Sequence, residues 1–229
     1  MNSPRPKTPI KLVKSPLSEL AYIELKRQIL DRELLPGDRL NIDALSRSCG
    51  ISTSPLREAL ARLTAEGLVA FAANTGFSVE SLPDAQKMAQ MMDFRLLMEE
   101  HCARLGADRK DADTAAMLQQ LHHEMVALRK SGVTYQEHRA YIDLEQRFHQ
   151  AIVDSAGNDS ISHAYRNLHL ILAVSRLSVV SGSNQVGSDA AMQEHQEIVT
   201  AFAEGDGARA AAAVRGHLQG AAQRMAPHA

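Results

Sequence analysis

The stretch GISTSPLREALARLTAEGL, residues 50–68, places a polar segment with a proline directly before a stripe of leucine and alanine. Gly50 suits the end of a preceding short helix, because glycine adopts positive φ at little cost. Ser54 is a good N-cap and Pro55 a good first helical residue, since that position needs no backbone N–H. The apolar positions then recur at helical spacing: Leu56, Ala59, Leu60 and Leu63. We therefore expect a tight turn followed by a helix whose polar amino end faces outward.

The sequence on either side extends this pattern. Upstream, an apolar-periodic helix over 18–32 ends at Leu35-Pro36-Gly37-Asp38, and a short second helix ends at Gly50. Downstream, two apolar runs flank Asn74-Thr75-Gly76, a turn that suits a β-hairpin. A generic helical hairpin gives a similar stripe, but this ordered run favours a winged helix-turn-helix. In that fold the amino end of the second helix enters the major groove, where N–H groups, hydroxyls and an arginine reach phosphates and base edges.

The composition indicates an α-rich globular protein. Of 229 residues, 45% are hydrophobic and 4% aromatic, and the chain has room for one large domain or two modest ones. Cys49 and Cys102 lie far apart in apolar surroundings, so we expect buried free thiols rather than a disulfide or a thiolate zinc site. No apolar run has the length of a membrane helix, and residues 1–14 lack the apolar segment of a secretory signal. We therefore expect a cytoplasmic protein without a membrane partner.

The charges are distributed unevenly. Residues 1–81 carry 11 Lys/Arg against 9 Asp/Glu, a net charge of +2, and residues 82–229 carry 14 against 18, a net charge of −4. Residues 1–14 form a basic, proline-broken arm without acidic residues. We expect this arm to be disordered, and it either tracks phosphates or is a solvated tail.

The remainder predicts an antiparallel helical bundle. Amphipathic segments with recognisable starts or stops extend over 84–106, 113–130, 135–156, 160–180, 189–204 and 207–225. Their connections are mostly short, which favours antiparallel neighbours.

Two histidines are placed symmetrically about a tight turn. His195 lies ten residues before Gly205, and His217 lies ten residues after Gly207. At about 1.5 Å rise per residue, both lie about 15 Å from the turn if the two helices are antiparallel. The spacing therefore predicts that the two imidazoles are level with each other.

A third histidine has an acidic neighbour on its own helix. Glu145 and His149 are four residues apart, so both side chains lie on one face of the helix over 135–156. One carboxylate and three imidazoles suit an N3O site for Zn²⁺ or a similar divalent ion, with positions left for water or a chelating ligand. The alternative is a set of ordinary surface or hydrogen-bonded histidines. The other seven histidines show no comparable pairing.

These residues give the first half a resemblance to the GntR family of bacterial transcription regulators, through PGDRL (36–40), the run at 50–69 and NTGF (74–77). In that family a winged helix-turn-helix binds palindromic operators as a dimer. The resemblance implies DNA contacts from the following residues: Ser52, Thr53, Ser54, Arg57, and Asn74 and Gly76 at the wing tip. The family commonly has arginine where this chain has Thr53. A threonine can bind a phosphate but cannot hold a guanine bidentately, so the operator preference of relatives does not transfer.

The second half resembles the FCD effector domain of the FadR subfamily, through FRLLMEE (94–100), EQRFHQAIVDSAGN (145–158), EHQEIVTAF (194–202) and the spaced histidine. In that subfamily an acidic residue and three histidines hold a metal, and a small organic acid binds beside it. The resemblance implies these metal ligands: Glu145, His149, His195 and His217. The subfamily usually has aspartate at the first of these positions.

Three further residues are candidates for binding the effector. Arg95 matches an arginine that commonly faces the ligand in the subfamily, and an exposed helix charge is its alternative interpretation. Asn167 lies nine residues after Asn158, whereas His149 lies nine before it, so both can be level with the metal. Arg176 is the third candidate.

The sequence thus predicts a mainly α protein: a basic arm at 1–14, a winged helix-turn-helix with a β-hairpin wing at 15–81, and an FCD-like antiparallel helical domain for effector binding and dimerisation at 82–229. We expect a homodimeric, ligand-responsive transcription regulator, a repressor, that binds double-stranded operator DNA and senses a small carboxylate or hydroxycarboxylate. The cofactor is a divalent metal ion, Zn²⁺ first, with Ni, Mn or Fe as alternatives. No catalytic residues are expected. Two other hypotheses are a metal-dependent enzyme acting on a small carboxylate and an architectural DNA-binding dimer with a structural metal.

Overall fold

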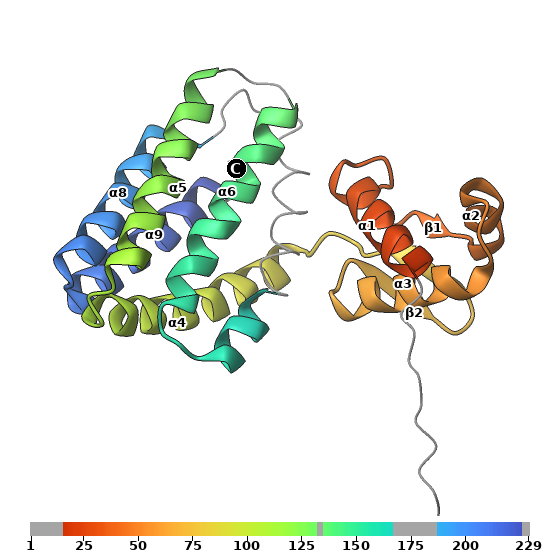
Figure 1. Ribbon diagram of the computed structural model, residues 1–229, viewed down its shortest axis with the longest axis horizontal. Coiled ribbons are helices and arrows are strands. Elements are labelled where there is room, and N and C mark those ends of the chain that lie inside the picture. The colour runs from red at the N-terminus through yellow and green to blue at the C-terminus, as the bar shows by residue number, and fades with distance from the viewer. Residues whose placement is uncertain (1–15, 132–134, 167–186, 226–229) are drawn as a thin grey trace, which may run out of the picture. The chain divides into compact units, whose positions relative to one another are not determined.

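The computed structural model describes residues 16–131, 135–166 and 187–225. The chain divides into two compact units, Met1–Glu80 and Ser81–Ala229. The predicted fold class is confirmed: helices dominate, a small antiparallel sheet completes the first unit, and the described part of the second unit is helical (Figure 1). The predicted basic arm lies outside the described residues. No helix in the described ranges is long and apolar enough to cross a membrane.

The first unit is a three-helix core with a three-stranded sheet. Its helices are α1 (Pro16–Leu30), α2 (Ile42–Cys49) and α3 (Thr53–Ala65). Its strands are β1 (Arg39–Leu40), β2 (Val69–Ala72) and β3 (Gly76–Val79), in the order β1-β3-β2. β2 and β3 form the predicted wing hairpin, and Phe71 faces Phe77 across it with ring centroids 4.8 Å apart. The short β1 was not predicted, because two residues carry too little pattern to be recognised.

The start of α3 corrects one prediction. The N-cap is Ser52, without a side-chain cap bond, and the helix begins at Thr53, so Ser54 is a helical residue rather than the cap. Pro55 is therefore the third helical residue, two positions later than expected, and it is tolerated there because the first N–H groups of a helix have no intrahelical partner. The predicted stripe of α3 is buried, and Gly50 ends α2 at φ +66° as expected.

The two cysteines differ in exposure. Cys102 is buried on the second unit's first helix, as predicted. Cys49 is exposed, contrary to the prediction, because α2 buries none of its residues.

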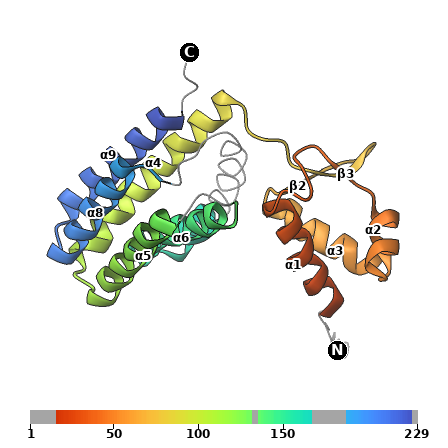
Figure 2. The ribbon, with the colours of Figure 1, turned by 90° about the horizontal axis from the view of Figure 1, so that it is seen from above.

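The second unit consists of long helices. They are α4 (Ala85–Asp108), α5 (Ala112–Ser131), α6 (Tyr135–Asp154), α8 (Asp189–Glu204) and α9 (Gly207–Met225). Residues 159–166 are also helical, and the rest of the helix predicted over 160–180 lies outside the described residues. α4 packs against α9 and α8, and α5 packs against α6 and α8 (Figure 2). This arrangement gathers side chains from these five helices around one interior.

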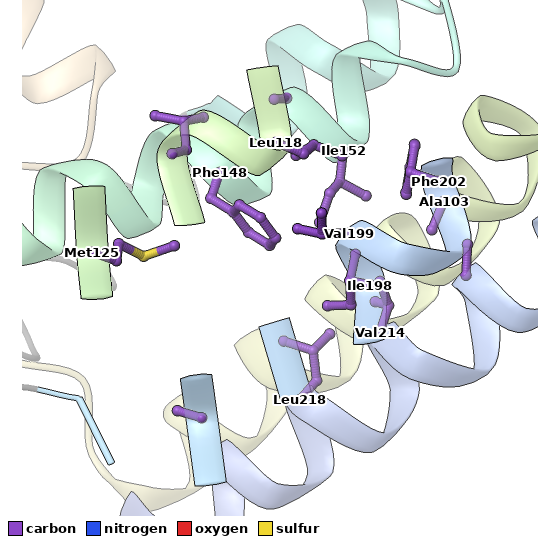
Figure 3. Close-up of a cluster of buried hydrophobic side chains, with 14 of the residues drawn as sticks. Ala103, Leu118, Met125, Phe148, Ile152, Ile198, Val199, Phe202, Val214 and Leu218 are labelled. Atoms are coloured by element: carbon purple, nitrogen blue, oxygen red, sulfur yellow. The ribbon is translucent and has the colours of Figure 1, made fainter. Parts of the chain in front are cut away.

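The interior of the second unit is apolar and closely packed. Phe148 and Ile152 of α6 face Ile198 and Val199 of α8 in Figure 3. Burial of such side chains contributes roughly 1.5–3 kcal/mol each. Since Phe148 precedes His149 and lies 4.8 Å from the ring of His195, centroid to centroid, this packing also fixes two of the candidate metal ligands.

Candidate functional site

The four predicted metal ligands come together inside the second unit. One ligand atom each from Glu145, His149, His195 and His217 lies within 4.8 Å of the other three. Glu145 and His149 come from α6, at the predicted four-residue spacing, with the Glu145 Oε1 and His149 Nε2 atoms 3.8 Å apart. All four residues are buried. The alternative of surface histidines is thereby excluded for these three, whereas hydrogen-bonded histidines without an ion stay an alternative.

The two histidines of the α8–α9 hairpin face each other as their spacing predicts. Gly205 ends α8 in the left-handed conformation, at φ +67°, and the chain reverses directly into α9. The Nε2 atoms of His195 and His217 lie 3.2 Å apart. His149 completes the triangle, with its ring 5.1 Å from that of His217 and 5.5 Å from that of His195.

The arrangement fits a divalent ion. With zinc–nitrogen distances of about 2.0–2.1 Å, a 3.2 Å separation between two nitrogens corresponds to an angle of about 100° at the ion, close to tetrahedral. The ligand atoms farthest apart are up to 4.8 Å from each other, so this separation would contract by roughly 1.2–1.5 Å around a tetrahedral ion whose ligands lie at about 2.0–2.2 Å. Three imidazoles and one carboxylate are a donor set that zinc and its first-row neighbours accept.

Two carboxylates lie immediately behind the histidine rings, and the sequence analysis missed both. The Nδ1 atom of His149 lies 2.6 Å from Oε2 of Glu99 on α4. The Nδ1 atom of His217 lies 2.9 Å from Oε2 of Glu194 on α8. Glu99 could have been noticed as an acidic residue on the apolar face of α4, four residues after Arg95.

Arg95 is fully buried, so its alternative interpretation as an exposed helix charge is wrong. Its Nε donates a hydrogen bond to Glu99, and among the described residues neither terminal nitrogen has a hydrogen-bond partner. Burial alone would lower the pKa of Arg95, but the charge of Glu99 outweighs burial and raises the pKa above its ordinary value. The guanidinium is therefore charged, and its two terminal nitrogens have no hydrogen-bond partner within residues 16–131, 135–166 and 187–225.

Tyr165 completes the surroundings of Glu99. Its hydroxyl donates a hydrogen bond to Oε1 of Glu99, and the tyrosine is fully buried. Burial and the neighbouring carboxylate raise the pKa of Tyr165 well above its ordinary value, so the phenol stays protonated and remains a donor. Glu99 thus joins α4, α6 and the helical segment 159–166.

The other two predicted effector-binding residues, Asn167 and Arg176, lie outside the described residues, so their placement relative to the cluster stays a prediction.

The predicted DNA-contacting residues lie at one end of α3 and at the wing tip of the first unit. Ser52, Ser54 and Arg57 are exposed at the amino end of α3, and Thr53 is half-buried. Asn74 is exposed in the hairpin turn, and Gly76 begins β3 at φ +77°. A helix amino end with hydroxyls and an arginine suits phosphates and base edges. Their individual DNA contacts stay predictions.

A winged helix-turn-helix joined to a domain whose described part is helical and holds a buried polar cluster defines a DNA-binding transcription regulator with a ligand-sensing domain. Comparison with known families agrees. The model of the gntR family of bacterial regulatory proteins matches residues 17–79, and the FCD domain model matches residues 90–220. The chain belongs to the GntR family and carries an FCD domain.

Known relatives extend over most of the chain. The HTH-type transcriptional regulator LutR of Bacillus subtilis is 28% identical over 208 residues, covering 83% of this chain and 92% of LutR. The HTH-type transcriptional repressor GlaR of Escherichia coli is 26% identical over 211 residues, covering 86% of this chain and 90% of GlaR. The solved structure of E. coli McbR/YncC has the same fold, with a TM-score of 0.75 at 18% identity, and the match covers 93% of this chain and 97% of that chain.

Membership of this family decides between the hypotheses of a transcription regulator and of a metal-dependent enzyme. The family and its matched relatives are transcription regulators, so the prediction that the protein is not an enzyme is confirmed, and the hypothesis of a metal-dependent enzyme is wrong.

Proposed function

We propose that the protein is a homodimeric repressor that senses a small carboxylate or hydroxycarboxylate at a divalent metal site, with residues 15–81 binding the operator and residues 82–229 binding the effector. The observation that carries this proposal is the buried convergence of one carboxylate and three imidazoles, with a charged arginine nearby whose terminal nitrogens find no hydrogen-bond partner in the described part of the chain. The repressor role is supported by the similarity to GlaR, which is a transcriptional repressor.

The chemistry of the cluster supports metal binding. Glu145, His149, His195 and His217 would hold the ion, with Zn²⁺ as the first expectation and Ni, Mn or Fe as alternatives. When bound, such an ion supplies a positive charge and open positions for an oxygen ligand. The glutamate has one methylene more than the aspartate usual in the subfamily, and its Oε1 atom lies 3.8 Å from Nε2 of His149.

Arg95 supports a carboxylate as the effector. A buried charged group with unsatisfied donors is costly, and a bidentate carboxylate satisfies two of them. An acid that binds one arrangement of the bundle better than another shifts the population toward that arrangement, and operator affinity changes with it. This is how a small ligand in the second unit would control the first.

Exposed apolar side chains on α4 support dimerisation. Leu97 is 72% exposed and Phe94 44% exposed, about one helical turn apart. We expect a second copy of the chain to cover them. Sedimentation velocity should show a dimer for the wild type and a shift to monomer for Leu97→Asp, whereas Met117→Asp on α5, also an exposed apolar position, should stay dimeric.

The test is a thermal-shift screen of zinc-loaded protein against small carboxylic and hydroxycarboxylic acids, followed by operator binding with each hit. An acid at a hundred times its Kd stabilises the native state by about 2.7 kcal/mol. Arg95→Lys should reduce this shift, because lysine cannot bind a carboxylate bidentately, and Arg104→Lys, an exposed position of α4, should not.

The outcomes separate the proposal from its remaining alternative. An acid that binds and changes operator affinity supports a sensor. A protein that binds zinc and operator but responds to no acid is an architectural dimer with a structural metal. A reporter gene under the operator should be expressed less when the protein is present, and higher expression contradicts the repressor role.

A further inference from the structure

Two of the candidate metal ligands are held from behind by carboxylates on other helices. The His149 Nδ1 to Glu99 Oε2 distance is 2.6 Å, and the His217 Nδ1 to Glu194 Oε2 distance is 2.9 Å. A neutral imidazole carries one proton, on one of its two nitrogens. A carboxylate at Nδ1 accepts that proton's hydrogen bond, so the lone pair is on Nε2. In both rings Nε2 is the nitrogen directed at the cluster.

Each carboxylate is itself fixed by further donors. Glu99 accepts hydrogen bonds from Nε of Arg95 and from the hydroxyl of Tyr165. Glu194 accepts two hydrogen bonds from Arg224 on α9, of 2.8 and 2.7 Å. Neither carboxylate can turn away from its histidine without breaking these contacts.

We propose that Glu99 and Glu194 are positioning residues of the metal centre, which fix the tautomer and ring orientation of His149 and His217. The inference rests on the metal site of the proposed function and adds two residues that do not touch the ion. A carboxylate behind a histidine orients the ring and increases its basicity as a ligand. Glu99 has a second consequence, because it also binds Arg95: one carboxylate aligns a metal ligand and the arginine assigned to the effector.

The test is the Zn²⁺ dissociation constant of the full-length protein, measured by competition with a chromophoric chelator. Glu194→Gln and Glu99→Gln should each weaken zinc binding by about 10- to 100-fold. The chain offers a matched control for each. Glu100→Gln alters the neighbour of Glu99, which pairs with Arg215 at the surface, and Glu197→Gln alters a residue of α8 that pairs with Arg209. Both controls should bind zinc with wild-type affinity.

A spectroscopic measurement separates positioning from a general structural role. In the Co²⁺-loaded protein the visible absorption bands report the coordination geometry. They should change in Glu194→Gln and Glu99→Gln and stay unchanged in both controls. Glu99→Gln leaves the buried charge of Arg95 without its partner, which can prevent folding. The side chain of Glu194 is 24% exposed, so Glu194→Gln does not leave a fully buried charge without its partner. If Glu99→Gln does not fold, Glu194→Gln alone tests the inference.

Failure of the inference differs from failure of the proposed function. If the wild type does not bind one zinc ion per chain, the metal site of the proposed function is wrong. If the wild type binds zinc and the glutamine variants bind it equally well with unchanged Co²⁺ spectra, the metal site stands and the positioning role is overturned.

Discussion

His195 on α8 and His217 on α9 lie with their Nε2 atoms 3.2 Å apart, although 22 residues separate them in the chain. The left-handed Gly205 ends α8, and α9 begins two residues later at Gly207, so equal distances from the turn bring the two rings level. The two rings therefore meet between α8 and α9, and both lie beside the ring of His149 on α6.

Removal of either hairpin histidine should abolish stoichiometric metal binding. His195→Ala deletes a proposed ligand itself, whereas Glu99→Gln and Glu194→Gln alter residues behind the ligands. The loss of zinc affinity should therefore exceed the about 10- to 100-fold loss expected for those two variants. Elemental analysis of dialysed protein should give about one zinc per chain for the wild type and far less for the variant. His163→Ala, an exposed histidine of the same unit, is the control. Equal zinc content in all three proteins would remove His195 from the site.

The grouping of the candidate ligands was predictable in part because their spacings are local. Glu145 and His149 share a helix face, and His195 and His217 flank one turn, so each pair follows from helix geometry alone. That the two pairs meet depends on the packing of α6 against the hairpin, which periodicity does not specify. The family resemblance supplied that step.

The residues behind the ligands were not predictable in the same way. Glu99 contacts His149 from a helix 50 residues earlier in the chain, and no spacing rule relates α4 to α6. One signal could have been recognised in the sequence of α4. Arg95 and Glu99 lie on its buried face among apolar residues, and charged residues are seldom buried unless they are paired or functional.

Arg57 should be required for operator binding. It is exposed at the amino end of α3, where the helix is expected to enter the major groove. Arg57→Ala should weaken binding to DNA from the region beside its own gene by about 1–3 kcal/mol if the arginine contacts a base. If Arg57 contacts a phosphate instead, the slope of log affinity against log salt concentration should become shallower by about one.

Fluorescence anisotropy over a range of salt concentrations measures both effects. Arg215→Ala is the matched control, since it removes one exposed arginine from α9 in the other unit. An unchanged affinity and an unchanged footprint for Arg57→Ala would contradict the proposed contact.

Two helical glycines of the second unit should respond oppositely to alanine. A methyl group at Gly106 of α4 would overlap the hydroxymethyl group of Ser155, which follows α6, and lie 3.3 Å from Phe202. Overpacking costs about 1–3 kcal/mol and exceeds the helix-propensity gain of about 1 kcal/mol, so Gly106→Ala should destabilise the unit. At Gly216 of α9 none of the described residues lies within 4 Å of the added methyl group. Gly216→Ala should stabilise by about 0.5–1 kcal/mol.

Urea unfolding monitored by circular dichroism distinguishes these cases. The double variant Gly106→Ala/Ser155→Gly removes the overlapping side chain and should recover most of the lost stability. If Gly106→Ala is as stable as the wild type, the close approach of α4 to the end of α6 is wrong, and with it the distance between Glu99 and His149.

Stability should fall on mild acidification because of His122. This residue of α5 is 5% exposed, and its Nε2–H donates a 3.1 Å hydrogen bond to the carbonyl of Met192 on α8. Burial lowers the pKa of His122 below its ordinary 6.5, so the unfolded chain binds this proton more readily than the folded one. The stability that neutral His122 contributes is therefore fully present above pH 6.5. It declines as the pH falls from 6.5 toward the lowered pKa of the folded state. The difference in unfolding free energy between the wild type and His122→Gln, measured in urea without metal, should therefore shrink between pH 7.5 and 5.5; a constant difference contradicts it.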